Sequence, residues 1–204
     1  MLTINNQVFL LLNAAVDASP TLVYVAELVA SSLIDLIPVL LVALWVWGQP
    51  ARRSGLVATS IAAGLALGAN QIVGLFWYEP RPFMVSLGRT LVAHVPENSF
   101  PSDHTTFILT VGIALMTTRA APTWGKVVSV LGVVVAWARI YLGLHFPLDM
   151  LASALIASLF GASAALPVSV VRRWIMPIGD RTYEAALDML RLPPRIFPRR
   201  RGRG

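Results

Sequence analysis

Residues 54–76 read SGLVATSIAAGLALGANQIVGLF and contain no charged side chain. A helix needs about 20 mostly apolar residues to cross the hydrocarbon core of a bilayer, so this stretch is long enough to form one span. Residues 22–48, 127–144 and 148–171 are also long and mainly apolar, although each contains at least one ionisable residue. Residues 104–118 are shorter, and they can span if the helix is tilted or if the preceding loop dips into the membrane.

The composition excludes an ordinary soluble domain. Hydrophobic residues make up 56% of the 204 residues and charged residues 13%, whereas a soluble domain carries roughly 25% charged residues. Residues 4–18 fit either an interfacial helix or a partial span. We therefore predict an all-α integral membrane protein, a bundle of five to six transmembrane helices. The absence of cysteine excludes disulfides and thiolate metal sites.

The basic residues predict how the spans are oriented. Lysine and arginine are enriched in the cytoplasmic loops of membrane proteins. One alternation of the spans places most of the internal basic residues on the cytoplasmic side: Arg52, Arg53, Arg119, Lys126, Arg172 and Arg173. The opposite side then carries only Arg81, Arg89 and Arg139, together with residues 77–103 and the short turn at 143–147.

The net charge of +6 depends largely on the end of the chain. The basic residues there are Arg191, Arg195, Arg199, Arg200, Arg201 and Arg203. Such a tail binds anionic lipid headgroups more often than nucleic acid, so no nucleic-acid partner is expected. We therefore divide the chain into a membrane-embedded domain, residues 1–176, and a cytoplasmic basic tail, residues 177–204. Within the tail, residues 179–190 have the apolar spacing of a short surface helix.

Several ionisable residues are predicted to lie at the outer border of the membrane. An ionisable side chain is costly to place there, so each of them is a candidate functional residue. They come from three separate regions of the sequence: Arg81, His104, Arg139, His145 and Asp149. Arginine binds phosphate oxygens bidentately, and histidine serves as a nucleophile or a general acid near neutral pH. An aspartate bonded to one ring nitrogen fixes the tautomer of the histidine.

Two local patterns bring these residues together. Ser102 precedes an apolar run as a natural N-cap, and the first turn of that helix would form an anion site beside His104; a plain helix cap with a surface histidine is the simpler alternative. Pro147 suits the first turn of the last span, so His145 and Asp149, four residues apart, can meet there. For Arg139 the simpler alternative is a side chain that reaches the membrane surface.

At this point the chain resembles the type 2 phosphatidic acid phosphatase superfamily, which carries three motifs. Arg81-Pro82 matches the end of Lys-x6-Arg-Pro, and Pro101-Ser102-Asp103-His104 matches Pro-Ser-x-His. Arg139, His145 and Asp149 match Ser-Arg-x5-His-x3-Asp in order and spacing. The resemblance covers residues 20–172. Within the superfamily, residues 80–83, 99–104 and 141–150 are most similar to BcrC-type undecaprenyl-diphosphate phosphatases.

The resemblance implies a membrane phosphatase of the bacterial inner membrane, with its active site on the periplasmic or extracellular face. The implied catalytic residues are His145 as nucleophile, Asp149 as its orienting partner and His104 as acid and base; the implied substrate-binding residues are Arg81, Ser102 and Arg139. The implied substrate is a polyprenyl diphosphate lipid, undecaprenyl diphosphate, whose hydrolysis recycles the lipid carrier of cell-wall synthesis. Neither a metal nor a cofactor is expected.

Two positions depart from the family pattern. Gly74 stands where the first motif has lysine, and Ala138 replaces the serine before the motif arginine. Asn70 and Gln71 are candidates to donate hydrogen bonds in place of the lysine. Other readings stay open: a phosphatase of phosphatidylglycerophosphate, phosphatidate or lipid A, a lipid phosphotransferase, or a small non-enzymatic transporter subunit. The sequence leaves the oligomeric state open.

Overall fold

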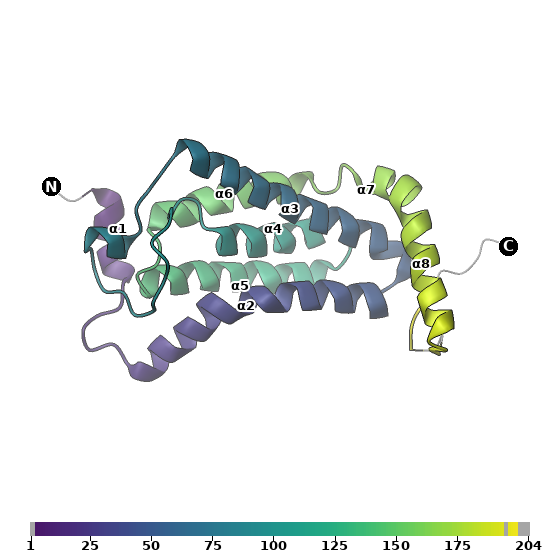
Figure 1. Cartoon of the computed structure of the whole chain (residues 1–204), viewed down its shortest axis with the longest axis horizontal. Coiled ribbons are helices and arrows are strands. Elements are labelled where there is room, and N and C mark those ends of the chain that lie inside the picture. The colour runs from purple at the N-terminus through teal and green to yellow at the C-terminus, as the bar shows by residue number, and fades with distance from the viewer. Residues whose placement is uncertain (1–2, 194–195, 200–204) are drawn as a thin grey trace.

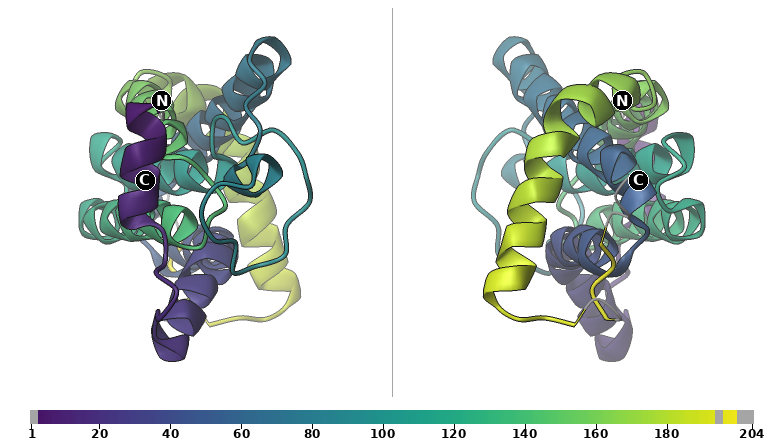
Figure 2. Two further views of the ribbon diagram at one scale, coloured as in Figure 1. Left: turned by 90° about the vertical axis from the view of Figure 1, so that its left-hand side faces the viewer. Right: turned by 90° about the vertical axis from the view of Figure 1, so that its right-hand side faces the viewer.

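The computed structural model of the chain describes residues 3–193 and 196–199. Five helices run side by side as an elongated bundle (Figure 1): α2 (Pro20–Trp47), α3 (Arg53–Phe76), α4 (Asp103–Thr117), α5 (Pro122–Tyr141) and α6 (Pro147–Ser163). Short α1 (Ile4–Leu12) lies at one end of the bundle, and α8 (Met176–Met189) crosses the other end (Figure 2). Among the described residues there is no strand, only an isolated bridge between Pro80 and Asn98. The all-α membrane fold is confirmed.

Three helices are long and apolar enough to cross a membrane by themselves, and a bent pair at the C-terminal side would make a fourth. The three are α2, α5 and the segment Pro50–Phe76, which contains α3. α4 and α6, with 15 and 17 residues, are shorter than the prediction of five to six full spans requires. Both still run alongside the longer helices, so the predicted bundle of five is present.

The N-terminal segment, residues 4–18, does not form a full membrane span. α1 has nine residues, and at 1.5 Å per residue it is about 14 Å long, half the thickness of a hydrocarbon core. Of the two alternatives for residues 4–18, the short interfacial helix therefore agrees with the structure. The span predicted at 148–171 is also shorter, because α6 ends at Ser163. Pro167 follows closely, and proline cannot continue a helix since it lacks the backbone donor.

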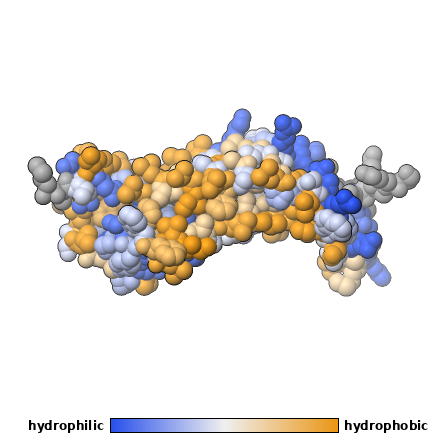
Figure 3. Space-filling model, turned by 90° about the horizontal axis from the view of Figure 1, so that it is seen from above, coloured by the Kyte–Doolittle hydropathy of each residue, from blue (hydrophilic) through white to orange (hydrophobic). Residues whose placement is uncertain are grey.

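α4 forms the centre of the bundle. It packs against α3, α5 and α6, while α2 covers α5. Ile108, Val111 and Leu115 of α4 are fully buried. The faces turned away from this core are apolar as well, for example at Leu151, Leu155 and Leu159 of α6; Figure 3 shows apolar residues along most of the bundle. A surface of this kind suits the acyl chains of a bilayer.

The far end of the bundle is closed by α8. Three-residue α7 (Val168–Val170) and a π-helical turn (Val171–Ile175) lead into it, and this segment is bent by 49° relative to α6. The surface helix predicted at 179–190 is thus present and begins three residues earlier. Buried Arg53 holds it, because its guanidinium lies 3.5 Å from Asp180 and 4.1 Å from the ring centre of Tyr183.

The predicted basic tail is only partly described. Arg195, Arg200, Arg201 and Arg203 lie outside the described residues. Arg199 forms an ion pair with Asp188 of α8 at 2.5 Å. The division of the chain at residues 176 and 177 stays a prediction.

Candidate active site

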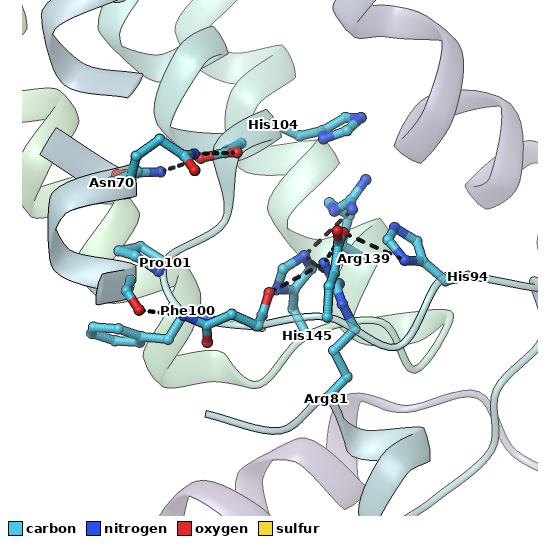
Figure 4. A pocket seen from close by; sticks show the side chains of 13 residues that line it. Asn70, Arg81, His94, Phe100, Pro101, His104, Arg139 and His145 are labelled. Carbon is cyan, nitrogen blue, oxygen red and sulfur yellow. Dashed lines mark hydrogen bonds and ion pairs between the residues drawn. The ribbon is translucent and has the colours of Figure 1, made fainter. Parts of the chain in front are cut away.

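A cavity of about 270 Å³ opens at the α1 end of the bundle. It lies where α3 ends and α4 begins, where the turn from α5 to α6 passes, and beneath the loop of residues 77–102. The lining side chains, drawn in Figure 4, are Asn70, Gln71, Gly74, Arg81, His94, Glu97, Asn98, Phe100, Pro101, Asp103, His104, Arg139 and His145. The structure thus brings Arg81, His104, Arg139 and His145 to one cavity.

His145 lies in the tight turn between α5 and α6. Gly143 makes this turn possible, because its φ of +81° is a conformation that other residues rarely adopt. A Cβ atom at Gly143 would also collide with the carbonyl oxygen of Arg89 in the loop. The turn and the loop therefore pack against each other directly, and this contact places the imidazole under the loop.

The imidazole of His145 is held from both sides. Its Nε2 lies 3.0 Å from Nη1 of Arg81 and 3.3 Å from Nη2 of Arg139. A guanidinium only donates hydrogen bonds, so Nε2 accepts both and carries no proton. Burial lowers the pKa of His145 well below its ordinary value, and the charges of Arg139 and Arg81 lower it further. The ring is therefore neutral, with its proton on Nδ1.

Asp149 lies behind the ring, in the first turn of α6. Its Oδ2 atom is 3.2 Å from Nδ1 of His145 and accepts the backbone N–H of Phe146 at 2.8 Å. Ser99 of the loop adds a third contact, since its Oγ donates to the same oxygen at 2.5 Å and lies 3.2 Å from Nδ1. Asp149 and Ser99 are both buried. The proton on Nδ1 is thus held by a carboxylate that is itself fixed by two donors.

The two arginines are anchored by backbone groups. Arg81 precedes a short 3-10 helix (Pro82–Val85), and its Nη1 also donates to the carbonyl oxygen of Leu144 at 3.0 Å. Arg139 lies in the last turn of α5, and its Nη1 donates to the carbonyl oxygen of Ala30 on α2 at 3.0 Å. The two residues are 4% and 3% exposed. Buried charges that lie so close together need an anion, which the cavity can receive.

His104 and Ser102 occupy different places relative to the cavity. His104, in the first turn of α4, is half-buried, forms no hydrogen bond to another described residue and lies on a different side of the cavity from His145 (Figure 4). Ser102 is the N-cap residue by position, but its hydroxyl makes no capping bond and does not line the cavity. Its backbone N–H is bound by Ser153 of α6 at 2.9 Å. The predicted N-cap position is therefore confirmed, although the hydroxyl does not form the capping hydrogen bond.

The polar groups near Gly74 bind the first turn of α4. Asn70 and Gln71 donate to the carboxylate of Asp103 at 2.8 and 3.0 Å. Asn70 uses both of its amide N–H groups, since it also donates to Thr106 at 3.0 Å. Gln71 has a second N–H group and lines the cavity, so its donation to a phosphate in place of the missing lysine stays a prediction. A side chain at Gly74 would also press on Asn98, whose Nδ2 lies 3.2 Å from the Cβ position. Ala138 packs in an apolar cluster against α2 and does not line the cavity.

Four residues of the loop were missed by the sequence interpretation: His94, Glu97, Asn98 and Ser99. Asn98 shapes the loop, because its side chain accepts from the backbone of Glu79 and Phe100 and donates to the carbonyl of Trp77. Glu97 forms an ion pair with Arg81 at 3.0 Å. Only Ser99 stood in a segment that contributed to the family resemblance. No periodicity marks a loop residue, so its partners become visible only in three dimensions.

Residues 55–173 match the sequence profile of the PAP2 superfamily. The chain belongs to this superfamily. The PAP2 protein is 37% identical to the provisionally named undecaprenyl-diphosphatase YbjG of Escherichia coli (strain K12) over 163 residues, which cover 79% of this chain and 81% of the relative. It is 30% identical to undecaprenyl-diphosphatase BcrC of Bacillus subtilis (strain 168) over 182 residues, 89% of this chain and 90% of the relative.

Two solved structures share the fold of this PAP2 protein. The crystal structure of Aquifex aeolicus LpxE superposes with a TM-score of 0.65 at 24% identity, over 80% of this chain and 95% of that one. A PAP2 type phosphatidylglycerolphosphate phosphatase from Bacillus subtilis superposes with a TM-score of 0.51 at 20% identity, over 83% of each chain. The family and the apolar helix bundle together identify the chain as a bacterial membrane phosphatase.

Proposed function

We propose that this protein hydrolyses undecaprenyl diphosphate to undecaprenyl phosphate and inorganic phosphate, and so recycles the lipid carrier of cell-wall synthesis. The observation that carries the proposal is the unprotonated Nε2 atom of His145, held between the guanidinium groups of Arg81 and Arg139. The choice of substrate rests on the two relatives named undecaprenyl-diphosphatase.

In the first step, Nε2 of His145 attacks the terminal phosphorus. The N–P bond forms as the bond from phosphorus to the bridging oxygen breaks. His104 takes up a proton when the negative charge of the diphosphate offsets the neighbouring arginines, and it gives this proton to the departing lipid phosphate. Arg81 and Arg139 turn from Nε2 to the phosphoryl oxygens and stabilise the charge that develops there. Asp149 holds the Nδ1 proton, so the positive charge on the phosphorylated ring has a counter-charge 3.2 Å away.

In the second step, water replaces the lipid phosphate in the cavity. His104, now unprotonated, takes a proton from the water as its oxygen attacks phosphorus. The N–P bond breaks, its electron pair returns to Nε2, and inorganic phosphate leaves. Ser102 does not line the cavity, so its proposed part is to hold the start of α4, through its backbone bonds to Ser153, rather than to bind phosphate through its hydroxyl. The mechanism uses no metal ion.

The position of the cavity suits a lipid whose head group lies at the membrane border. It lies at one end of an apolar bundle, where α3 ends at three consecutive exposed aromatic residues, Phe76, Trp77 and Tyr78. Aromatic residues are favoured at the level of the lipid head groups. We place the cavity on the periplasmic or extracellular face and propose that the tail at the opposite end binds anionic lipids of the cytoplasmic leaflet.

The test is phosphate release by purified protein from undecaprenyl diphosphate and, in parallel, from phosphatidylglycerophosphate, phosphatidate and lipid A. His145→Ala is expected to abolish release, because it removes the nucleophile, while EDTA leaves the wild type active. A preference for one of the other lipids would change the assigned substrate and leave the proposed mechanism intact. Strong inhibition by EDTA that magnesium reverses would contradict the mechanism, and labelled phosphate passing to a lipid acceptor would indicate a phosphotransferase.

A further inference from the structure

A carboxylate occupies part of the cavity that we assign to phosphate. Oε1 of Glu97 accepts a hydrogen bond from Nη2 of Arg81 at 3.0 Å. Nδ1 of His94 lies 3.9 Å from the same oxygen. Figure 4 shows that Arg81, His94, Arg139 and His145 gather around one space. The oxygen of Glu97 thus occupies an arginine N–H that would equally suit a phosphate oxygen, whereas Nδ1 of His94 is paired with the carbonyl of Val95 at 3.1 Å.

Glu97 is the principal counter-charge of Arg81. Burial lowers the pKa of Arg81, and Glu97 opposes this effect more strongly than any other neighbouring charge. The other terminal nitrogen of Arg81 is already bound to Leu144 and His145. Both terminal nitrogens therefore have partners, whereas Nε is buried without one among the described residues. A phosphate that binds this guanidinium through Nη2 has to compete with Glu97 for that nitrogen.

The side chain of Glu97 can turn away from Arg81 into water. It is 55% exposed, whereas the side chain of Arg81 is 5% exposed. A carboxylate that turns toward water regains its hydration, so its departure is far less costly than that of a buried charge. The pair is thus asymmetric, with a fixed arginine and a partner that can exchange.

We propose that Glu97 competes with the phosphate of substrate and product for Arg81. This inference rests on the proposed function, because it takes the space between Arg81, Arg139 and His145 as the phosphate site. The competition lowers the affinity of the site for inorganic phosphate, which has no lipid part to add binding energy. The product therefore leaves readily, and phosphate in the surrounding solution does not fill the site.

The test compares Glu97→Gln with Glu79→Gln. Glutamine keeps the size of Glu97 and can still accept a hydrogen bond from Arg81, but it carries no charge. Glu79 is in the same loop and loses the same charge, but the ion pair of Arg81 is with Glu97 and the charge of Glu79 acts instead on Asp149 behind the ring. It is therefore a control for loss of a nearby charge without loss of the contact to Arg81. Glu97→Gln is expected to tighten the binding of inorganic phosphate roughly three- to tenfold, because one repulsive charge disappears. Glu79→Gln is expected to leave it near the wild-type value.

Two measurements separate this inference from the proposed function. Inorganic phosphate binding is followed by its stabilisation of the folded protein against heat, which needs no turnover, and phosphate release from undecaprenyl diphosphate is followed separately. Unchanged or weaker phosphate binding in Glu97→Gln overturns the role of Glu97, even if the enzyme turns over normally. Tighter binding in a protein that releases no phosphate from any lipid supports the role and overturns the proposed function. Glu97→Ala serves the same comparison if Glu97→Gln does not fold.

Discussion

The chemistry proposed for this protein depends on which nitrogen of one imidazole carries a proton. Two arginines donate to Nε2 of His145, while Asp149 and Ser99 face Nδ1. This arrangement selects the tautomer in which Nε2 is the free nucleophile. A neutral histidine is favoured here because burial disfavours the charged ring and because protonation would add a third positive charge beside the two guanidiniums. The arginines thus prepare the nucleophile before they bind the phosphate.

Ser99 is the residue in this arrangement whose part can be tested most directly. Ser99→Ala removes the donor to Asp149, so the carboxylate and the imidazole lose a fixed partner in a buried place. We expect kcat to fall about tenfold to a hundredfold and KM to stay within about twofold, since Ser99 lies behind the ring and not in the cavity. Steady-state kinetics of phosphate release would measure both values.

Thr90→Ala provides the control for Ser99→Ala. It removes a hydroxyl from the same loop, at an exposed position with no hydrogen bond to a described residue. Its kinetic constants are expected to match those of the wild type. If Ser99→Ala kept the wild-type kcat, Ser99 would have no part in positioning His145.

At the scale of elements, the site depends on how the loop of residues 77–102 meets the turn between α5 and α6. Asn13, just after α1, ties the two together. Its side chain donates to the carbonyl oxygens of Arg89 and Tyr141 at 2.9 and 3.0 Å and accepts from the N–H of Arg89 at 2.7 Å. The N–H of Leu91 adds a bond to the carbonyl of Leu142 at 3.1 Å. Short α1 therefore serves the site although it does not span the membrane.

Gly143→Ala tests this contact between the turn and the loop. The new Cβ would strain a residue with φ of +81° and meet the carbonyl of Arg89. We expect the free energy of unfolding to fall by about 1–3 kcal/mol and activity to fall as the loop shifts. Gly64→Ala is the control, because a Cβ at Gly64 meets nothing within 4 Å and alanine favours the helix. Equal stability of the two variants would contradict a direct contact.

At the scale of the whole molecule, the two ends of the bundle differ in chemistry. One end carries the cavity and the loop, with arginines turned inward toward His145. The other carries α8 and the basic residues Arg172, Arg173 and Arg181, and hydrophilic side chains gather toward it in Figure 3. Because basic residues favour the cytoplasmic side, this difference predicts that the cavity faces outward.

The absence of cysteine makes this orientation easy to measure. A single cysteine can be placed at Val95 of the loop, which is 67% exposed, or at Met189 of α8, which is 79% exposed. In intact cells, Val95→Cys is expected to react with a membrane-impermeant maleimide and Met189→Cys is not. Both should react once the membrane is opened, which controls for folding and expression. The reverse pattern would place the cavity in the cytoplasm.

By itself, the sequence determined the helical membrane architecture and most of the candidate cavity. Long apolar segments predict membrane helices because hydrophobicity is a local property of the sequence. His145 and Asp149 are four residues apart, so their contact was predictable from that spacing. Helix length was less well predicted, since α6 stops before Pro167 and α1 is short. Arg81, His104, Arg139 and His145 line the cavity, Asp149 lies directly behind it, and Ser102 is buried away from it.

Only the tertiary structure decided what the loop contributes. Glu97 meets Arg81, and Ser99 meets Asp149 and His145, across sequence separations of 16 to 50 residues. No local pattern encodes such pairs, because they depend on how the loop folds over the end of the bundle and on Asn13 and Gly143, which hold it there. The physical reason is that a long apolar segment is contained within one stretch of sequence. The hydrogen bonds of a buried site join segments that are distant in the sequence and that only tertiary packing brings together.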